Sequence, residues 1–571
     1  MRVLLGCSVL AVCAAPLLSA TYVVDGSSEA ASDVSAGTAE APWKTISRAC
    51  AADLRPGDIV LVRSGVYRES VRIACSGEPG NPILFQAEPG GRVAIKGSEI
   101  VRGPWTRVGE LPNTPEPYPN AFANTWRIRL GDEFFTDARF SGTYDDKSRR
   151  WVSQVFLDDS KALQRIGPDP IYRNETYMQL ATVGRDVSDL IVDSFYFDPV
   201  DETLYVNILG EPAWYCVEVG VRGFPLSVEN AHDVVVRGFE VRHNRQPGGQ
   251  WPMASVSGCE RVTVEGCGFY QADFCGLGLG RSKDCVIRDC DLSYNGDTGL
   301  GMGECDGCVV ENCRALFNNY RRFFAGWHAG GMKCIPSNRA CTIRGCEVAH
   351  NVASDGIWFD SDNSDIRIIG NVSHHNGGAG MFFEINKGGG VIADNLVYAN
   401  GVRGIYISGS QNTWVVHNTV AGNDCGIVAM PRGEDWPLES IFVLSNLLLG
   451  NYTTGDTITH GNDLTLYMGA DQPPYERTVM SNHSDRNVYA NNGWSPTMRH
   501  SWNPDNSLDQ WRQQYGEDMN SRLMRVEWER KGTSFALLTT AGLEVAGPLP
   551  AECPWKPTDA ARVGSSITRW P

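Results

Sequence analysis

The chain has few basic residues for its length. Its 50 lysines and arginines stand against 67 aspartates and glutamates, which gives a net charge of −17 at pH 7. Nucleic acids and anionic membranes bind proteins through a basic face, so this balance disfavours both as partners. It also disfavours a strongly anionic glycan, unless the fold gathers a local basic patch. No nucleotide, haem or flavin motif is evident, and the sequence predicts no such cofactor.

Long apolar runs are missing after the first 20 residues. Arg2 precedes an apolar stretch over residues 3–18, which ends at the small residue Ala20. This is the pattern of a secretory signal peptide, with cleavage expected after Ala20. Cys13 allows a lipoprotein alternative, although Val12 fits poorly before such a cysteine. No later run approaches the ~20 apolar residues of a membrane helix. We therefore expect a secreted protein, extracellular or periplasmic, without a membrane span.

Residues from about 230 to 430 repeat one short phrase, a β-branched strand that ends in a turn. Its copies are residues 262–267, 285–290, 308–313, 341–346, 366–371, 390–395 and 414–419, with last residues that step by 23, 23, 33, 25, 24 and 24. A second phrase begins with glycine in every coil, and an asparagine series lies between the two. A period near 24 with several short strands indicates a solenoid. The predicted fold is all-β, a right-handed parallel β-helix.

Cysteines recur in the same register. They occupy two repeat positions: Cys267, Cys290, Cys313 and Cys346 share one, and Cys285, Cys308 and Cys341 share the other. We interpret them as inward ladders of free thiols, because cysteine packs well as a small buried hydrophobe. Disulfides between coils are the alternative, since export permits them. Cys50 and Cys75 could form a disulfide in the N-terminal cap.

The remaining segments suggest five parts. After the signal peptide (1–20) we expect an N-terminal cap and first coils (21–126), an inserted β-sandwich (127–218), the main β-helix (219–445) and C-terminal coils with a capping region (446–571). The insertion is predicted from alternating patches such as Ser194-Phe-Tyr-Phe-Asp198, which are typical of short antiparallel strands.

The glycine phrase carries the most informative columns. Side chains alternate between the two faces of a strand, and positions two and four are apolar in nearly every coil, so positions three and five should point outward. Position three reads Gly278, Gly301, Lys333, Trp358, Phe382 and Tyr406; position five reads Gly280, Gly303, Ile335, Asp360, Glu384 and Ser408. Two carboxylates therefore stand in adjacent coils beside a wall of three aromatic side chains, and the glycines leave a bare strip where a glycan could lie.

The spacing of this carboxylate pair predicts its chemistry. Stacked strands lie roughly 4.8 Å apart, and Asp360 and Glu384 should inherit about that separation. Retaining glycosidases need their two carboxyls about 5–5.5 Å apart, whereas inverting enzymes need about 6.5–9.5 Å. The geometry favours a double displacement through a covalent glycosyl-enzyme.

Two segments resemble known families. The segment with Pro42-Trp43-Lys44-Thr45-Ile46 and Gly65-Val66-Tyr67-Arg68-Glu69 is similar to the N-terminal coils of secreted β-helix carbohydrate enzymes. Gly356-Ile-Trp-Phe-Asp360 and Met381-Phe-Phe-Glu384-Ile-Asn386-Lys-Gly388 resemble the paired motifs of the β-xylosidases of glycoside hydrolase family 120. That resemblance implies a β-helix interrupted by a β-sandwich, with Asp360 as the nucleophile and Glu384 as the acid/base.

Further candidates surround the pair. The coil that ends at Cys346 carries about ten extra residues, which offer Arg322, Trp327 and His328 as walls of a sugar subsite. Lys333 could hold a substrate group or tune Asp360. Asp362, at the bend, is a second-choice carboxylate.

The predicted function is a retaining glycoside hydrolase acting on an oligo- or polysaccharide. One alternative is a polysaccharide lyase or uronan epimerase, with Lys333, Arg321 and Arg322 neutralising the uronate, or with calcium held by Asp360, Asp362 and Glu384. The other is a non-catalytic glycan-binding β-helix that uses the aromatic wall alone. The sequence does not choose the sugar, the linkage or the oligomeric state.

Overall fold

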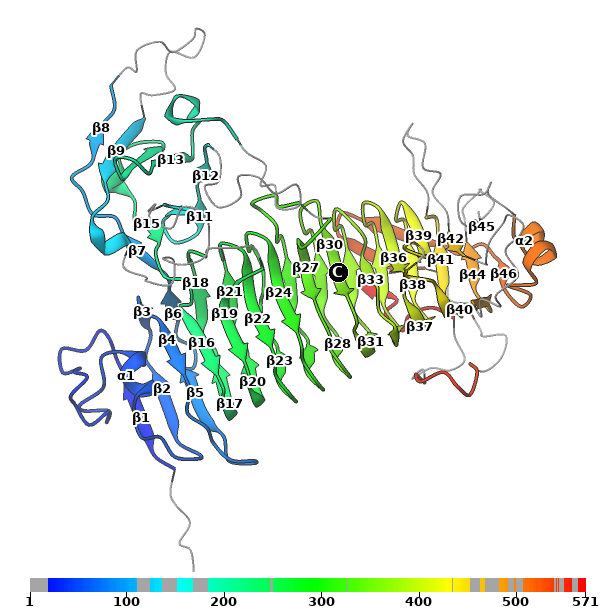
Figure 1. The fold of residues 1–571 in the computed structure, drawn as a ribbon, viewed down its shortest axis with the longest axis horizontal. Coiled ribbons are helices and arrows are strands. Elements are labelled where there is room, and N and C mark those ends of the chain that lie inside the picture. Colours follow the sequence, from blue (N-terminus) through cyan, green and yellow to red (C-terminus); the bar gives the residue numbers. More distant parts are fainter. Residues whose placement is uncertain are drawn as a thin grey trace, which may run out of the picture.

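The computed structural model describes residues 19–109, 124–135, 151–167, 183–246, 250–324, 326–433, 435–451, 463–467, 482–490, 498–499, 507–538, 541, 543, 549–556 and 563–570. These residues form a long solenoid of stacked β-coils (Figure 1). Residues 1–18 of the predicted signal peptide lie outside the described part. No helix within the described ranges has the length and apolar character needed to cross a membrane.

Three parallel sheets make the walls of the solenoid. The first contains β1 (Thr21–Val24), β2 (Ile59–Val62), β5 (Ile83–Ala87), β17 (His232–Arg237), β20 (Glu260–Glu265), β23 (Val286–Arg288), β25 (Val309–Glu311), β28 (Thr342–Arg344), β31 (Ser364–Ile369), β34 (Gly388–Ala393), β37 (Gln411–Val416), β40 (Glu439–Leu444) and β43 (His483–Asp485). The second contains β4 (Val71–Ile73), β16 (Leu226–Glu229), β19 (Pro252–Ser257), β22 (Cys275–Gly280), β24 (Thr298–Gly303), β27 (Gly330–Cys334), β30 (Asp355–Asp360), β33 (Met381–Glu384), β36 (Arg403–Ser408), β39 (Cys425–Met430), β42 (Leu464–Leu466) and β45 (Met498–Arg499). We call this second sheet the site sheet.

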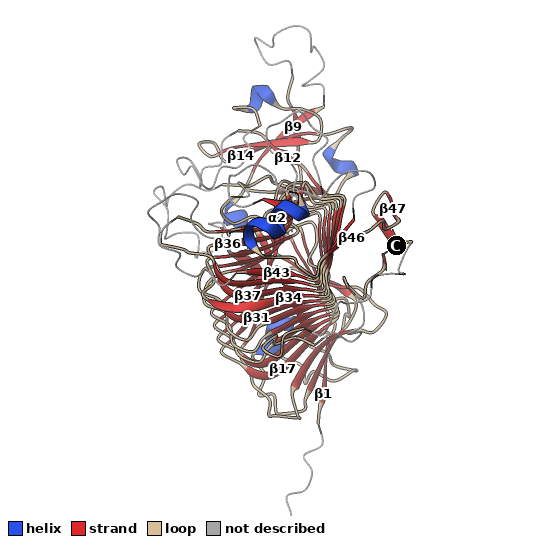
Figure 2. Ribbon diagram, turned by 90° about the vertical axis from the view of Figure 1, so that its right-hand side faces the viewer, coloured by secondary structure: helices blue, strands red, loops and turns tan. Residues whose placement is uncertain are grey.

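The third sheet has two parts that single bridges at Asp291 join. They contain β3 (Gly65–Tyr67), β6 (Val93–Lys96), β18 (Glu240–Arg242) and β21 (Gly268–Tyr270), then β26 (Arg314–Leu316), β29 (Glu347–Ala349), β32 (Val372–His374), β35 (Leu396–Tyr398), β38 (Thr419–Ala421), β41 (Leu447–Leu449), β44 (Val488–Ala490) and β46 (Arg522–Leu523). Seen from the end, the three sheets stack as flat walls around one interior (Figure 2).

An insertion interrupts the coils before β16 and projects from the stack (Figure 1). It contains two small, mainly antiparallel sheets over a shared apolar core. Their strands are β7 (Ser98–Ile100), β10 (Val155–Leu157), β11 (Lys161–Ala162) and β15 (Val217–Gly220), then β8 (Thr106–Arg107), β9 (Thr125–Arg129), β12 (Gln164–Arg165), β13 (Ser194–Asp198) and β14 (Thr203–Asn207). An all-β fold with an antiparallel insertion, as the sequence predicts, is confirmed.

The ends carry the remaining elements. Helix α1 (Ile46–Cys50) lies at the N-terminal coils, and helix α2 (Leu508–Tyr515) lies at the far end of the stack (Figure 1). Trp511 of α2 is fully buried and belongs to the main core. The hairpin of β47 (Trp528–Lys531) and β48 (Ser534–Leu537), with β49 (Arg569–Trp570), packs beside the third sheet. These segments cover apolar surface that an open solenoid would expose.

The interior is filled by the residues that the sequence assigns to it. Positions two and four of the glycine phrase are buried in the main core, and so are both predicted cysteine ladders. All sixteen cysteines of the described residues are free thiols, Cys50 and Cys75 included. The inward thiol ladders are therefore confirmed, and the structure has no disulfide between Cys50 and Cys75.

Buried asparagines stack at the bends and satisfy the turns. Asn376 accepts from the backbone N–H of Asn351 at 3.3 Å, and its Nδ2 donates to Asn400 Oδ1 at 2.9 Å and to the carbonyl of Val348 at 3.0 Å. Each such asparagine thus links its coil to the coil before it and to the coil after it. This explains why one residue type repeats at this position.

We expect Asn376→Ala to lower the free energy of unfolding by about 2–4 kcal/mol, because it leaves several buried donors and acceptors without partners. The measurement is the denaturant midpoint. The matched control is the exposed Asn520, whose replacement by alanine should change stability by less than about 0.5 kcal/mol. Equal effects in the two variants would contradict a structural role for the ladder.

Candidate active site

The structure brings Asp360 and Glu384 side by side on the outer face of the site sheet. Strands β30 and β33 pair in parallel, with Asp360 opposite Glu384 and Trp358 opposite Phe382. Strands in register lie about 4.8 Å apart, so the two carboxyl groups project from neighbouring coils at about that spacing. The local cause is the alternation of the phrase, which buries Phe359 and Phe383 and turns their neighbours outward.

Both oxygens of Asp360 accept hydrogen bonds from neighbouring side chains. Lys333 Nζ donates to its Oδ2 at 2.8 Å, and Ser361 Oγ donates to its Oδ1 at 2.9 Å. Lys333 stands one coil earlier in the neighbouring column and is 2% exposed. Asp360 is thus oriented by a buried cation on one oxygen and a hydroxyl on the other.

Burial disfavours the charged form of Lys333. Burial lowers the pKa of Lys333 to about 8, and the nearby Asp360 carboxylate opposes this effect only in part. The ammonium group lies 2.9 Å from the centroid of the Trp358 ring and donates to the carbonyl of Trp327 at 2.9 Å. Lys333 therefore contacts the Asp360 carboxylate, the aromatic wall and the loop that contains Trp327.

Glu384 has a different set of partners. Trp358 Nε1 donates to its Oε2 at 3.1 Å, and Arg432 forms an ion pair with its Oε1. The Arg432 side chain is 54% exposed and comes from the loop after β39. Asp360 thus has a buried cation beside it, whereas the cation beside Glu384 lies on an exposed loop and can leave.

The three aromatic side chains form a stacked wall. The ring centroids of Trp358 and Phe382 lie 5.0 Å apart, and those of Phe382 and Tyr406 lie 4.6 Å apart, with interplanar angles of 19° in both pairs. Trp358 is buried beneath Lys333, whereas Phe382 and Tyr406 are half-buried. The accessible part of the wall is therefore Phe382 and Tyr406.

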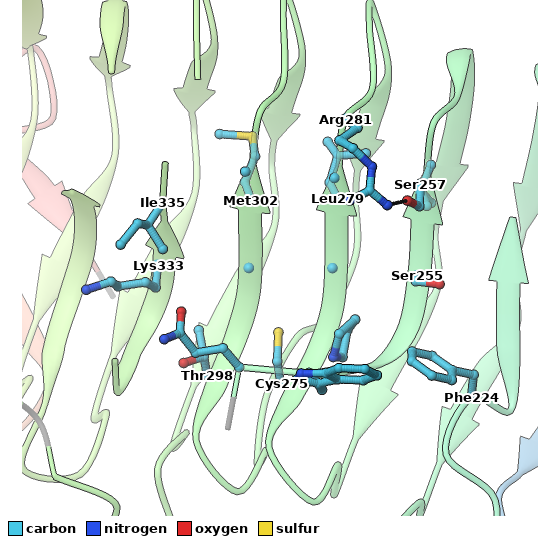
Figure 3. A pocket seen from close by; sticks show the side chains of 18 of the residues that line it. Phe224, Ser255, Ser257, Cys275, Leu279, Arg281, Thr298, Met302, Lys333 and Ile335 are labelled. Atoms are coloured by element: carbon cyan, nitrogen blue, oxygen red, sulfur yellow. Dashed lines mark hydrogen bonds between the residues drawn. The ribbon is translucent and has the colours of Figure 1, made fainter. Parts of the chain in front are cut away.

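A cavity of about 610 Å³ extends from Lys333 over the site sheet, away from Glu384. The bare strip predicted from Gly278, Gly280, Gly301 and Gly303 forms its floor. Figure 3 shows Lys333 and Ile335 at one end and Phe224 at the other, across several stacked strands. Lys333 both lines the cavity and contacts Asp360, so one side chain links the cavity to the carboxylate pair in the next coils.

The candidate residues of the extra loop before β27 differ in their exposure. Trp327 is 39% exposed and Arg322 is exposed, so both can face a ligand. His328 is fully buried, and its Nδ1 lies 2.7 Å from Asp297 Oδ2. His328 therefore has no surface for direct sugar contact in this structure, and it anchors the loop instead. Asp362 is exposed at the bend, one residue beyond Ser361.

Three residues of the site escape the sequence patterns. Arg432 and Trp251 lie outside the repeated phrases, in a loop and just before β19. Asp355, at the start of β30, accepts from the N–H of Ala379 at 2.5 Å, and burial raises its pKa to about 6. Asp355 stands directly before the glycine of its phrase, and this position in the repeat is the sequence signal that could have identified it.

Two clusters of the described residues have the composition of metal ligands. His350, His374 and His375 bring ring nitrogens together, but His350 and His375 stack in a ladder with Phe317 and Tyr294. Asp159, Glu218 and His243 form the other cluster, where Lys96 already binds both carboxylates. Of the carboxylates considered for calcium, Asp360 and Glu384 each already pair with a cationic side chain.

Comparisons with known proteins agree with the fold. The family described as "Right handed beta helix region" matches residues 252–425 and 322–468. A search of the curated proteins gives no match. The solved structure of XylC with xylose is similar with a TM-score of 0.65 and 17% identity, over 90% of this chain and 88% of that chain.

Two further solved structures share the topology more distantly. The GH136 lacto-N-biosidase from Eubacterium ramulus has a TM-score of 0.39 and 14% identity, over 72% of this chain and 67% of that one. Pectate lyase Pel9A has a TM-score of 0.38 and 14% identity, over 77% and 78%. The chain is a right-handed parallel β-helix with an antiparallel insertion.

Proposed function

We propose that this protein is a retaining glycoside hydrolase that acts on a glycan outside the cell. The observation that carries the proposal is the register of β30 and β33, which puts Asp360 and Glu384 opposite each other in adjacent coils, one coil beyond the Lys333 that lines the cavity. A spacing near 4.8 Å fits the about 5–5.5 Å of retaining enzymes and is too short for the water of an inverting one.

The different cations favour one assignment of roles. Lys333 is buried against Asp360 and places a fixed ammonium donor 2.8 Å from its Oδ2, which suits a nucleophilic carboxylate. Arg432 is half-exposed, so an incoming sugar can displace it from Glu384 and allow that carboxyl group to take a proton. Glu384 is then the acid/base, in line with the resemblance to the family 120 β-xylosidases.

The reaction follows in two balanced steps. Asp360 attacks the anomeric carbon and the glycosidic bond breaks, while Glu384 gives its proton to the leaving oxygen. Water then attacks the glycosyl–Asp360 ester, Glu384 takes a proton from this water, and the free sugar and the Asp360 carboxylate are released. Phe382 and Tyr406 provide an apolar platform beside the reacting ring.

The likeness to the structure of XylC with xylose supports a sugar substrate and makes a xyloside the first choice. A signal-like N-terminus over residues 1–20 supports export. A lyase would need cations that are available to neutralise a uronate, whereas Lys333 and Arg432 are paired with the two carboxylates.

The test is a screen of residues 21–571 against aryl glycosides and polysaccharides. We expect wild-type protein to release reducing sugar whose first-formed anomer, by NMR, has the configuration of the substrate. Products that absorb as unsaturated uronates would replace the hydrolase with a lyase. Binding to glycans with no product from any substrate would leave a binding protein.

A further inference from the structure

The cavity beside Lys333 is longer than one sugar ring requires. Its lining begins at Lys333 on β27 and continues across β24 and β22 to Trp251, directly before β19. Four strand steps separate β19 from β30, which corresponds to about 19 Å along the stack at 4.8 Å a step. A single sugar at Asp360 would leave most of this cavity empty.

The floor of the cavity suits a flat chain of sugar rings. Small residues occupy both outward columns over three consecutive coils: Ser255, Ser257, Gly278, Gly280, Gly301 and Gly303. An added Cβ at Gly280 would meet only the Gly303 carbonyl oxygen, at 3.9 Å, so the space above this position is open. Serine hydroxyls supply hydrogen-bond partners at one end.

An aromatic side chain ends the floor. Trp251 is 45% exposed, and its ring centroid lies 6.1 Å from that of Phe224. Both residues line the cavity. An exposed tryptophan held beside a second ring is a rigid apolar platform on which a distant sugar can stack.

The cavity extends to one side of the carboxylate pair only. Beyond Glu384 the outward columns are less open, since Ser408 is 2% and Val428 is 7% exposed, although Tyr406 remains half-buried. The loop with Arg432 and Trp436 lies here, because an added Cβ at Gly409 would meet both side chains within 3.0 Å. The chain must therefore extend toward Trp251.

Charge selects the class of chain. Three charged residues line the cavity: Glu229 pairs with Arg72 at 2.7 Å, Lys333 pairs with Asp360 at 2.8 Å, and the exposed Arg281 donates to the neutral Ser257 hydroxyl at 3.0 Å, which leaves it a single cation rather than one of a row. A polyuronate would need a row of available cations along the floor. The lining provides serine, threonine and glycine instead.

We infer that the strip from Lys333 to Trp251 binds a neutral oligosaccharide of several units, with Trp251 as its distal platform. This inference rests on the proposed function for the position of the reacting sugar. It adds that contacts three to four coils away from the carboxylates distinguish long substrates from short ones.

Two variants test the inference by comparing activity on a long and a short substrate. Trp251→Ala removes the platform, and Gly280→Leu fills the open floor without backbone strain. We expect each to lower the ratio of kcat/KM for a xylohexaose to that for an aryl xyloside about tenfold, because each removes or blocks a sugar contact far from the carboxylates. The matched controls are Trp214→Ala and Gly109→Leu, both exposed on the insertion side, and they should leave the ratio unchanged.

A binding measurement separates this inference from the proposed function. Calorimetry on Asp360→Asn, with neutral oligosaccharides and oligogalacturonides of two to six units, should show affinity that rises with length for the neutral chains only. Such binding without any hydrolysis by the wild type would overturn the hydrolase and keep the cleft. Hydrolysis of aryl glycosides with no dependence on length, or tighter binding of oligogalacturonides, would overturn the inference.

Discussion

Asp360→Asn should lower kcat/KM for an aryl glycoside by at least about 10⁴-fold, because the amide cannot form the glycosyl ester. Asparagine keeps the shape of the side chain and one of its two acceptor oxygens, so the fold should be retained. The control is Asp365→Asn, an exposed aspartate of the same coil in a left-handed turn that asparagine also tolerates. We expect full activity from it.

Glu384→Gln should have a different kinetic signature. An activated aryl leaving group needs little acid assistance, so formation of the glycosyl-enzyme should survive better than its hydrolysis, which needs a base. Azide attacks without a base and should restore turnover as a glycosyl azide of retained configuration. Rescue of Asp360→Asn to this same product, rather than of Glu384→Gln, would contradict the assigned roles.

The second large effect is expected at Lys333. Lys333→Met should lower kcat/KM about 10- to 100-fold, since it removes a charged hydrogen bond to the nucleophile and one support of the inserted loop. The control is Lys283→Met, an exposed lysine that is absent from the cavity lining. A loss confined to KM would indicate that Lys333 serves binding alone.

The pH dependence has a definite sign. Because burial lowers the pKa of Lys333 to about 8, the ammonium loses its proton as pH rises through 8, and kcat/KM should fall above that pH. In Lys333→Arg the limb should move to higher pH, since guanidinium stays charged. Between pH 8 and the ordinary lysine value of 10.5, the unfolded chain binds more protons at this position. The contribution of Lys333 to stability therefore rises with pH there, and unfolding at this residue does not account for the falling activity.

The central columns of the site could be predicted because side chains alternate between the two faces of a strand, and the repeat carries the same alternation into every coil. Once Ile357 and Phe359 are assigned to the interior, Trp358 and Asp360 must face outward, and the period of 24 puts Glu384 beside Asp360. The contact between Lys333 and Asp360 follows from the same register, because β27 and β30 belong to adjacent coils. Local rules suffice wherever neighbouring coils are equivalent.

The loops could not be predicted in this way. His328 is buried because Asp297, 31 residues earlier in a turn, binds its ring, and no periodic signal marks that pair. Arg432 reaches Glu384 from the loop after β39, whose course depends on packing against Gly409. The repeat also gives no indication that Trp251 ends the strip, because the residue precedes its strand. Tertiary contacts decide each of these placements.

The most direct test of the central claim is to trap the covalent intermediate. A 2-deoxy-2-fluoro-xyloside with an activated leaving group should inactivate the enzyme, because the fluorine slows both steps while the leaving group restores the first. Mass spectrometry of the digested protein should then show one added fluorosugar on the peptide that contains Asp360, and none in Asp360→Asn. A label on Glu384 would reverse the two roles, and turnover of the active enzyme without any covalent adduct would contradict the double displacement.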